Sequence, residues 1–166
     1  MFELKPLHPD SIPAALEKAR HYRLLNEPLQ AESICLDILE VDPRNQEALI
    51  TLLLALTDQF EHRLQTRFRK ARSLLPQLDD EYSRLYYDGI LCERRALAHF
   101  KRGGPGSGYV AYDWFRQAME YYEQAEKLRP PENDDPVLRW NTCARIVMRN
   151  PELKPEPEQT SHHFLE

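Results

Sequence analysis

The sequence AMEYYEQAEKLRP, residues 118–130, decides the fold. It places a small residue, an aromatic residue, a second small residue and a helix-ending proline at Ala118, Tyr122, Ala125 and Pro130. The first three lie on one face of a helix, because an α-helix has about 3.6 residues per turn. The same offsets of four, three and five return in residues 31–43 and 64–76, so the chain contains an internal repeat.

Seven helices are expected from apolar residues at three- and four-residue spacing, bounded by prolines and by Asn or Asp caps. Their approximate ranges are 12–25, 28–41, 46–58, 61–75, 81–100, 109–129 and 137–149. Short links between successive helices favour antiparallel hairpins. The helix at 46–58 is apolar almost all round, which predicts a position in the middle of the stack.

The rest of the chain is expected to be irregular. Residues 1–10 form an extended lead-in, and residues 11–150 form one helical domain. The glycine-rich segment 101–108 predicts a mobile loop. Residues 151–166 are rich in Pro, Glu and His, which predicts a disordered tail. The final pair, Leu165 and Glu166, is set aside as a possible cloning remnant.

Composition narrows the classes of function. A net charge of −5 and an isoelectric point near 5.7 argue against broad binding to a phosphate backbone. Cys35, Cys92 and Cys143 lie far apart on apolar stripes, which predicts buried, reduced thiols. No apolar run reaches the length of a membrane span, and the first residues lack the features of a signal peptide. A cytoplasmic protein is therefore expected.

The repeated offsets resemble the second helices of tetratricopeptide repeats, in which small residues permit close packing and a proline ends each unit. Pro43 and Pro76 are 33 residues apart, close to the family's period of about 34. Pro130 lies further on, so the third repeat is enlarged. The resemblance covers about residues 12–150 and implies an all-α fold. This fold is a short right-handed α-solenoid of antiparallel helix hairpins, with three repeats and a capping helix.

The resemblance also implies a function. In this family the first helix of each pair lines a concave groove that binds a peptide, so a non-catalytic protein-interaction module is expected. Arginines at both ends of an apolar floor favour an acidic or amphipathic peptide. The alternative is that these arginines are solvated and pair with neighbouring glutamates. The matched groove positions are Arg20, Arg23, Leu49, Leu53, Tyr86, Ile90, Arg94, Asn141 and Arg145.

A second hypothesis is a structural module that forms a homodimer through its end helices or through the aromatic helix at 109–129. Tyr109, Tyr112, Trp114 and Phe115 are more aromatic residues than one buried stripe needs. They are either core residues or, where exposed, a second contact surface.

Catalytic and cofactor chemistry is not expected. The sequence has no HExxH motif, nucleophile elbow or Cys/His pair, so no catalytic or metal-binding residues are assigned. The glycines at 103–108 precede a helix, but the Lys-Ser/Thr of a phosphate-binding loop does not follow them. His162 and His163 are adjacent in the tail without a fixed third ligand. No cofactor, nucleic acid or membrane partner is assigned.

Overall fold

The fold is all-α. The computed structural model describes residues 1–158, which form seven α-helices and two short 3-10 turns. The helices are α1 (Ile12–Leu24), α2 (Pro28–Val41), α3 (Gln46–Thr57), α4 (Phe60–Leu74), α5 (Glu81–Arg102), α6 (Ser107–Leu128) and α7 (Asp135–Arg149). The turns are η1 (Pro9–Ser11) and η2 (Leu75–Gln77). The expected helix boundaries agree with these within two residues, since prolines and caps mark most of them.

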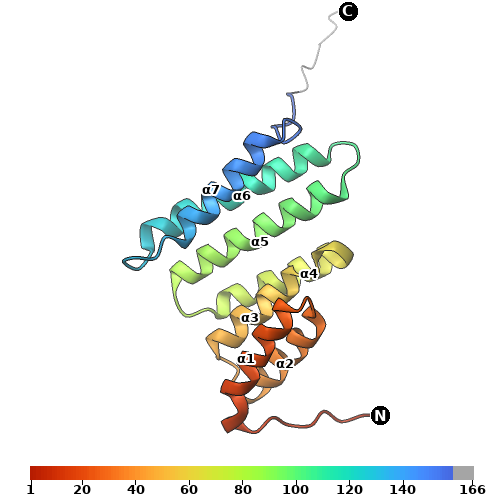
Figure 1. Cartoon of the computed structure of the whole chain (residues 1–166), viewed down its shortest axis with the longest axis vertical. Helices are drawn as coiled ribbons and strands as arrows, with labels where there is room; N and C mark the ends of the chain where they lie inside the picture. The colour runs from red at the N-terminus through yellow and green to blue at the C-terminus, as the bar shows by residue number, and fades with distance from the viewer. Residues whose placement is uncertain (159–166) are drawn as a thin grey trace, which may run out of the picture.

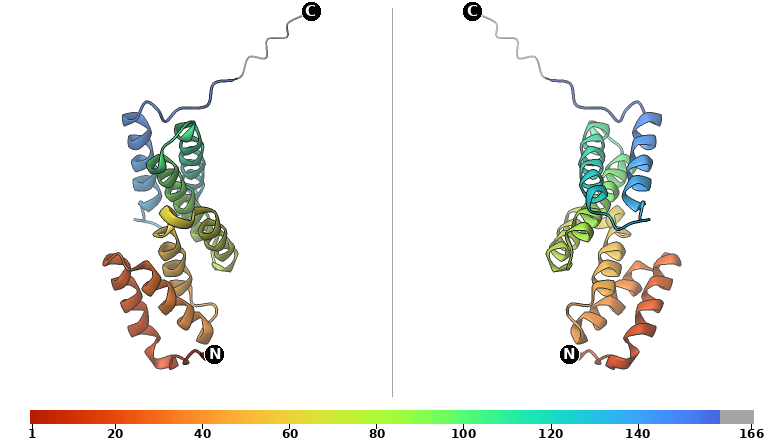
Figure 2. Two further views of the ribbon diagram at one scale, coloured as in Figure 1. Left: turned by 90° about the vertical axis from the view of Figure 1, so that its right-hand side faces the viewer. Right: turned by 90° about the vertical axis from the view of Figure 1, so that its left-hand side faces the viewer.

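Each helix packs against its neighbours in the chain as an antiparallel pair. Figure 1 shows the helices following one another along the long axis, from α1 and α2 beside the N-terminus to α6 and α7 at the opposite end. The side views in Figure 2 separate α1–α3 from α5–α7, with α4 between them. The helices can be grouped as the pairs α1–α2, α3–α4 and α5–α6. In addition to the contacts within and between these pairs, α1 contacts α3 and α3 contacts α5, so the first helices of successive pairs are neighbours.

Local sequence signals explain where several helices begin. The side chain of Asn45 accepts a hydrogen bond from the amide of Ala48 at 2.9 Å and caps α3. Asp80 caps α5 in the same way, accepting from the amide of Ser83 at 2.7 Å. Pro28 opens α2 at the first helical position, where its missing amide hydrogen is not needed.

The repeated offsets mark the buried faces of α2, α4 and α6, the second helices of the three pairs. Ala31, Cys35 and Ile38 of α2 are fully buried, and so are Ala118, Tyr122 and Ala125 of α6. The equivalent residues of α4 are at most 7% exposed; they are Leu64, Phe68 and Ala71. The helical period of the sequence therefore identified the core-facing residues correctly. The three cysteines are also buried and unpaired.

Two main apolar clusters form the core. The first joins residues of α1–α5 around α3, whose Leu49, Leu52, Leu53 and Leu56 are at most 1% exposed. The second joins α5, α6 and α7 around Phe115, Tyr122 and other buried residues. Trp114 packs against both clusters. The central position expected for α3 is confirmed, because almost all of its sides are covered.

The C-terminal part of the domain holds two features of note. Trp140 of α7 is half-buried: it packs against the second cluster, and its Nε1 donates to Glu123 at 3.0 Å. The expected disordered tail begins with a packed residue, since Leu153 is 4% exposed and belongs to the second cluster. Its amide donates to the carbonyl of Asn150 at 2.9 Å. Residues 159–166 of the tail, which include His162 and His163, lie outside the described part of the chain.

Candidate functional site

Asp58, at the end of α3, connects two of the predicted groove arginines. Its Oδ2 accepts from Nε of Arg23 at 2.8 Å, and its Oδ1 accepts from an Nη of Arg23 at 3.2 Å. An Nη of Arg94 lies 4.0 Å from the same Oδ1. Arg23 belongs to α1 and Arg94 to α5, so the first helices of three successive pairs meet at one carboxylate. Asp58 is not among the residues predicted for the groove.

The other arginine of α1 is also paired. An Nη of Arg20 donates to Glu47 of α3 at 2.9 Å, and both side chains are more than half exposed. Arg20 and Arg23 therefore do pair with carboxylates, which was the alternative to a free peptide-binding role. This pairing joins different helices rather than successive turns of one helix. Because the side chains of Arg20 and Glu47 are exposed, their pair contributes little to stability and can exchange partners.

The apolar floor expected for the groove is not open. Leu49, Leu53 and Ile90 are 1%, 0% and 2% exposed, so an outside peptide cannot reach them. Leu49 and Leu53 belong to the first core cluster and Ile90 to the second. The reason is that other helices cover these sides of α3 and α5: α3 contacts α1, α2, α4 and α5, and α5 contacts α3, α4 and α6.

Three predicted residues lie away from Asp58. Tyr86 stacks on Tyr82 with ring centres 5.8 Å apart and packs against Tyr122 of α6. Asn141 lines a small hollow between α6 and α7, together with Trp140. Arg145 is exposed on α7. Of the predicted groove residues, Arg23 and Arg94 meet at Asp58. Arg20 lies nearby in the fold, because its ion pair with Glu47 joins α1 to α3, as the pair of Arg23 with Asp58 does.

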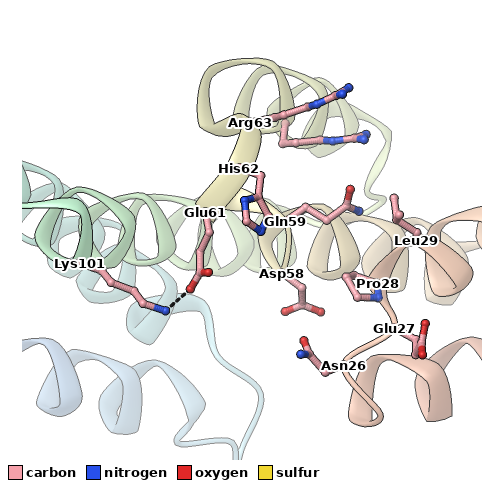
Figure 3. Close-up of a pocket in the computed structure, with 11 residues that line it drawn as sticks. Asn26, Glu27, Pro28, Leu29, Asp58, Gln59, Glu61, His62, Arg63 and Lys101 are labelled. Atoms are coloured by element: carbon pink, nitrogen blue, oxygen red, sulfur yellow. Dashed lines mark hydrogen bonds and ion pairs between the residues drawn. The ribbon is translucent and has the colours of Figure 1, made fainter.

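A cavity of about 780 Å³ lies beside Asp58, which is one of its lining residues. Its walls are formed by the α1–α2 turn, the α3–α4 turn, the first half of α4 and the last turn of α5 (Figure 3). At one end of the cavity, Lys101 pairs with Glu61. At the other end lie Glu27, Pro28 and Leu29, of which Leu29 is 66% exposed. The lining mixes both signs of charge with apolar surface.

A buried polar network adjoins this cavity. Glu32 of α2 accepts hydrogen bonds from Gln59 at 2.9 Å, Lys70 at 2.9 Å and Arg67 at 3.2 Å. Burial alone would raise the pKa of Glu32, but Gln59, Lys70 and Arg67 outweigh it and the pKa lies below its usual value. Glu32 is therefore ionised in the folded protein and ties α2 to the start and middle of α4.

A second buried network joins the last three helices. Glu93 of α5 is 2% exposed and accepts from the hydroxyl of Tyr122. Its other oxygen accepts from an Nη of Arg139 of α7 at 3.4 Å. Burial would lower the pKa of Arg139, but Glu93 and the neighbouring tyrosines raise it above its usual value. Both ends of this carboxylate have partners, so the network is a structural link rather than a poised acid or base.

Sequence reasoning missed both networks, although a weak signal was present. Glu32 and Glu93 occupy positions next to apolar residues on the stripes of α2 and α5, at Ala31 and at Cys92. A carboxylate beside the buried stripe indicates a buried pair, but its partners come from other helices and cannot be read from spacing.

Within residues 1–158, no group of three or more His, Cys, Asp or Glu side chains could hold a metal ion. Burial raises the pKa of the Cys35 and Cys92 thiols to about 12 and also raises that of Cys143, so thiolate chemistry is disfavoured at neutral pH.

None of the helices in residues 1–158 combines the length and the apolar character that a membrane span requires. The chain matches no family model, no curated protein and no solved structure.

Proposed function

We propose that this chain is a non-catalytic protein-interaction module of the tetratricopeptide type. Its ligand is an acidic or amphipathic segment of a partner protein, bound on the surface formed by α1, α3 and α5. The observation that carries the proposal is the convergence of Arg23 and Arg94 on Asp58, 35 and 36 residues away along the chain. First helices that lie side by side in this way are what a solenoid with a shared inner wall requires.

The binding chemistry is that of exposed guanidinium groups beside an open cavity. The side chains of Arg20 and Arg94 are 53% and 37% exposed, so each can donate hydrogen bonds to a second carboxylate beside its present partner. The cavity next to Asp58 offers Leu29 for an apolar side chain of the same segment. This surface replaces the buried leucine floor expected from the sequence.

The test uses peptides of defined charge. A displayed library of short peptides is selected against the whole chain, and the enriched sequences are titrated by fluorescence anisotropy. We expect acidic or acidic-apolar sequences to be enriched. Arg20→Gln combined with Arg94→Gln should weaken their binding by about tenfold or more, as loss of two charge-assisted contacts implies. Glutamine places no new carboxylate beside Glu47 or Asp58.

The matched control is Lys18→Gln combined with Lys127→Gln, two exposed lysines on α1 and α6. It removes the same charge and should leave peptide binding unchanged. Enrichment of basic peptides would refute the proposal. Equal loss of binding in the two double variants would also refute it, because the effect would then come from net charge alone.

Self-association is the second candidate, and one observation favours it. Leu24, Leu25 and Leu29 at the tip of the first hairpin are 86%, 56% and 66% exposed. Adjacent exposed leucines are a common feature of contact surfaces between copies of a chain. Light scattering at several protein concentrations separates the two functions. A dimer that Leu24→Ser with Leu29→Ser dissociates would support self-association, and a concentration-independent monomer would exclude it.

A further inference from the structure

A cleft lined by positive charge lies between α4 and α5. Arg63 lines both this cleft and the cavity beside Asp58, and the other described lining residues of the two differ. It consists of two hollows of about 400 and 470 Å³ that share Gln65 and Arg95. We call it the arginine cleft. Neither hollow has an aspartate or glutamate among its described lining residues. The basic residues that line it are Arg63, Arg69, Arg72, Arg95, His99 and Arg102.

Most of these cations have no anionic partner in the described chain. Arg72 pairs with Asp88 at 3.5 Å. Among residues 1–158, no carboxylate oxygen lies within 4.0 Å of the guanidinium groups of Arg63, Arg69, Arg95 or Arg102. Four unpaired arginines in one cleft are unexpected in a chain whose net charge is −5. Their mutual repulsion is a cost that a bound anion would remove.

Arg95 is held in place before any ligand binds. Its guanidinium carbon lies 4.4 Å from the ring centre of Phe68 and 4.2 Å from that of Trp114. One Nη donates to Gln65 at 3.1 Å, while Nε has no partner in the described residues. Contacts with two aromatic rings restrict the guanidinium, so the group loses little freedom when it binds an anion.

His99 lies one turn beyond Arg95 and shares the same environment. Its Nε2 is buried without a hydrogen-bond partner among residues 1–158. Burial and the charges of Arg95 and Arg102 lower the pKa of His99. Burial is the larger cause of this lowered pKa, and the positive charges of the two arginines add to it. Buried polar nitrogen and nearby guanidinium charges are together the surroundings expected of an anion site.

We propose that the arginine cleft binds a short, extended, acidic peptide segment of a partner. Guanidinium groups bind carboxylates through two parallel hydrogen bonds, and the cations here are spaced along a helix rather than gathered at one point. From Gln65 to Ser73 the axis of α4 rises by roughly 12 Å, the length of about four residues of extended peptide. A short segment fits this length.

A nucleic acid fits less well. A polynucleotide continues beyond the cleft at both ends, where it would meet the surface of a chain with net charge −5. The favourable release of counterions needs a longer basic face than one cleft supplies. A peptide can confine its acidic residues to the segment that enters the cleft. The site goes beyond the proposed function, because its cations come from α4 and from other positions of α5 than Arg94.

The experiment titrates a labelled peptide, with about six glutamates between Gly/Ser flanks, against the whole chain by fluorescence anisotropy. We expect saturable binding that weakens as salt is added. Arg69→Glu combined with Arg102→Glu should weaken it by about tenfold or more. Both residues are exposed and neither has a described ion-pair partner, so the melting temperature by circular dichroism should not change. Lys127→Glu combined with Arg149→Glu is the matched charge control and should retain binding.

Three results would overturn this proposal. They are the absence of saturable binding, equal binding by the Arg69→Glu/Arg102→Glu variant, and equally tight binding of an oligothymidylate of the same charge. The last result would assign the cleft to nucleic acid. The Arg20→Gln/Arg94→Gln variant separates this site from the proposed function, because it should retain binding at the arginine cleft. Failure at one surface therefore leaves the other independently testable.

Discussion

A Cβ atom on Gly89 would lie 2.5 Å from Cε1 of Tyr122, closer than two carbon atoms approach without displacement. Gly89 lies within α5, and Tyr122 is fully buried in α6. The tyrosine ring thus occupies the space that a side chain at position 89 would need. A glycine inside a helix costs about 1 kcal/mol relative to alanine, and the close contact of α5 with α6 is the physical reason for its presence here.

Gly89→Ala should therefore destabilise the protein, although alanine is the better helix former. The ring of Tyr122 must move, and its hydroxyl is held by Glu93. Overpacking of this kind costs typically about 1–3 kcal/mol. Chemical denaturation followed by circular dichroism measures the change. Gln124→Ala, at an exposed position of α6, is the control and should have almost no effect. A Gly89→Ala variant as stable as the parent would mean that the two helices are further apart.

Glu32→Gln should lower the stability at neutral pH by about 1–3 kcal/mol, the cost of leaving two partly buried cations without their negative partner. Lys70 and Arg67 would keep their positive charges beside an amide. The partly exposed Lys70 can turn towards solvent, which limits the loss. Glu40→Gln, on an exposed position of the same helix, should change little. Urea denaturation at pH 7 measures both variants.

The same residue predicts a pH dependence. The pKa of Glu32 is lower in the folded protein than its ordinary value of 4.5, so the unfolded chain takes up its proton first as the pH falls. The stabilisation by Glu32 is then fully present above about pH 4.5 and is lost as the pH falls through the folded pKa. Glu32→Gln should remove this component. A difference between parent and variant that stays constant from pH 7 to about pH 3 would contradict this.

Leu153→Ala should destabilise the protein by about 2–4 kcal/mol, the usual range for a buried leucine. Leu153 is 4% exposed and packs into the core shared by α5, α6 and α7. Composition alone would predict no effect, because the residue lies in a segment rich in proline and glutamate. Lys154→Ala, at the exposed neighbouring position, is the matched control. Equal melting temperatures for the two variants would show that the segment after α7 does not hold the domain together.

The helices were predictable because their signals are local. Asn45 and Asp80 cap the helices that follow them, and the offsets ending at Pro43, Pro76 and Pro130 identify faces that are buried. Each of these signals spans a few residues and needs no knowledge of distant parts of the chain. Leu153 was missed for the same reason, since the core that buries it comes from three other helices.

The candidate site was only partly predictable. The resemblance to tetratricopeptide repeats directed attention to Arg23 and Arg94, which do meet at one carboxylate. It also assigned Leu49 and Leu53 to an open wall, although both are core residues. Which side of α3 is exposed to solvent depends on how closely the neighbouring helices pack against it. The helical period of the sequence gives no information about that distance.

The amino-acid order by itself determined the seven helices, their boundaries and their buried stripes, because helical periodicity and capping act over one or two turns. Only the tertiary structure decided that Asp58 lies between Arg23 and Arg94, and that Arg95 is held between Phe68 and Trp114. These contacts join different helices. Their geometry follows from the packing of whole helices against one another, which no short stretch of the chain specifies.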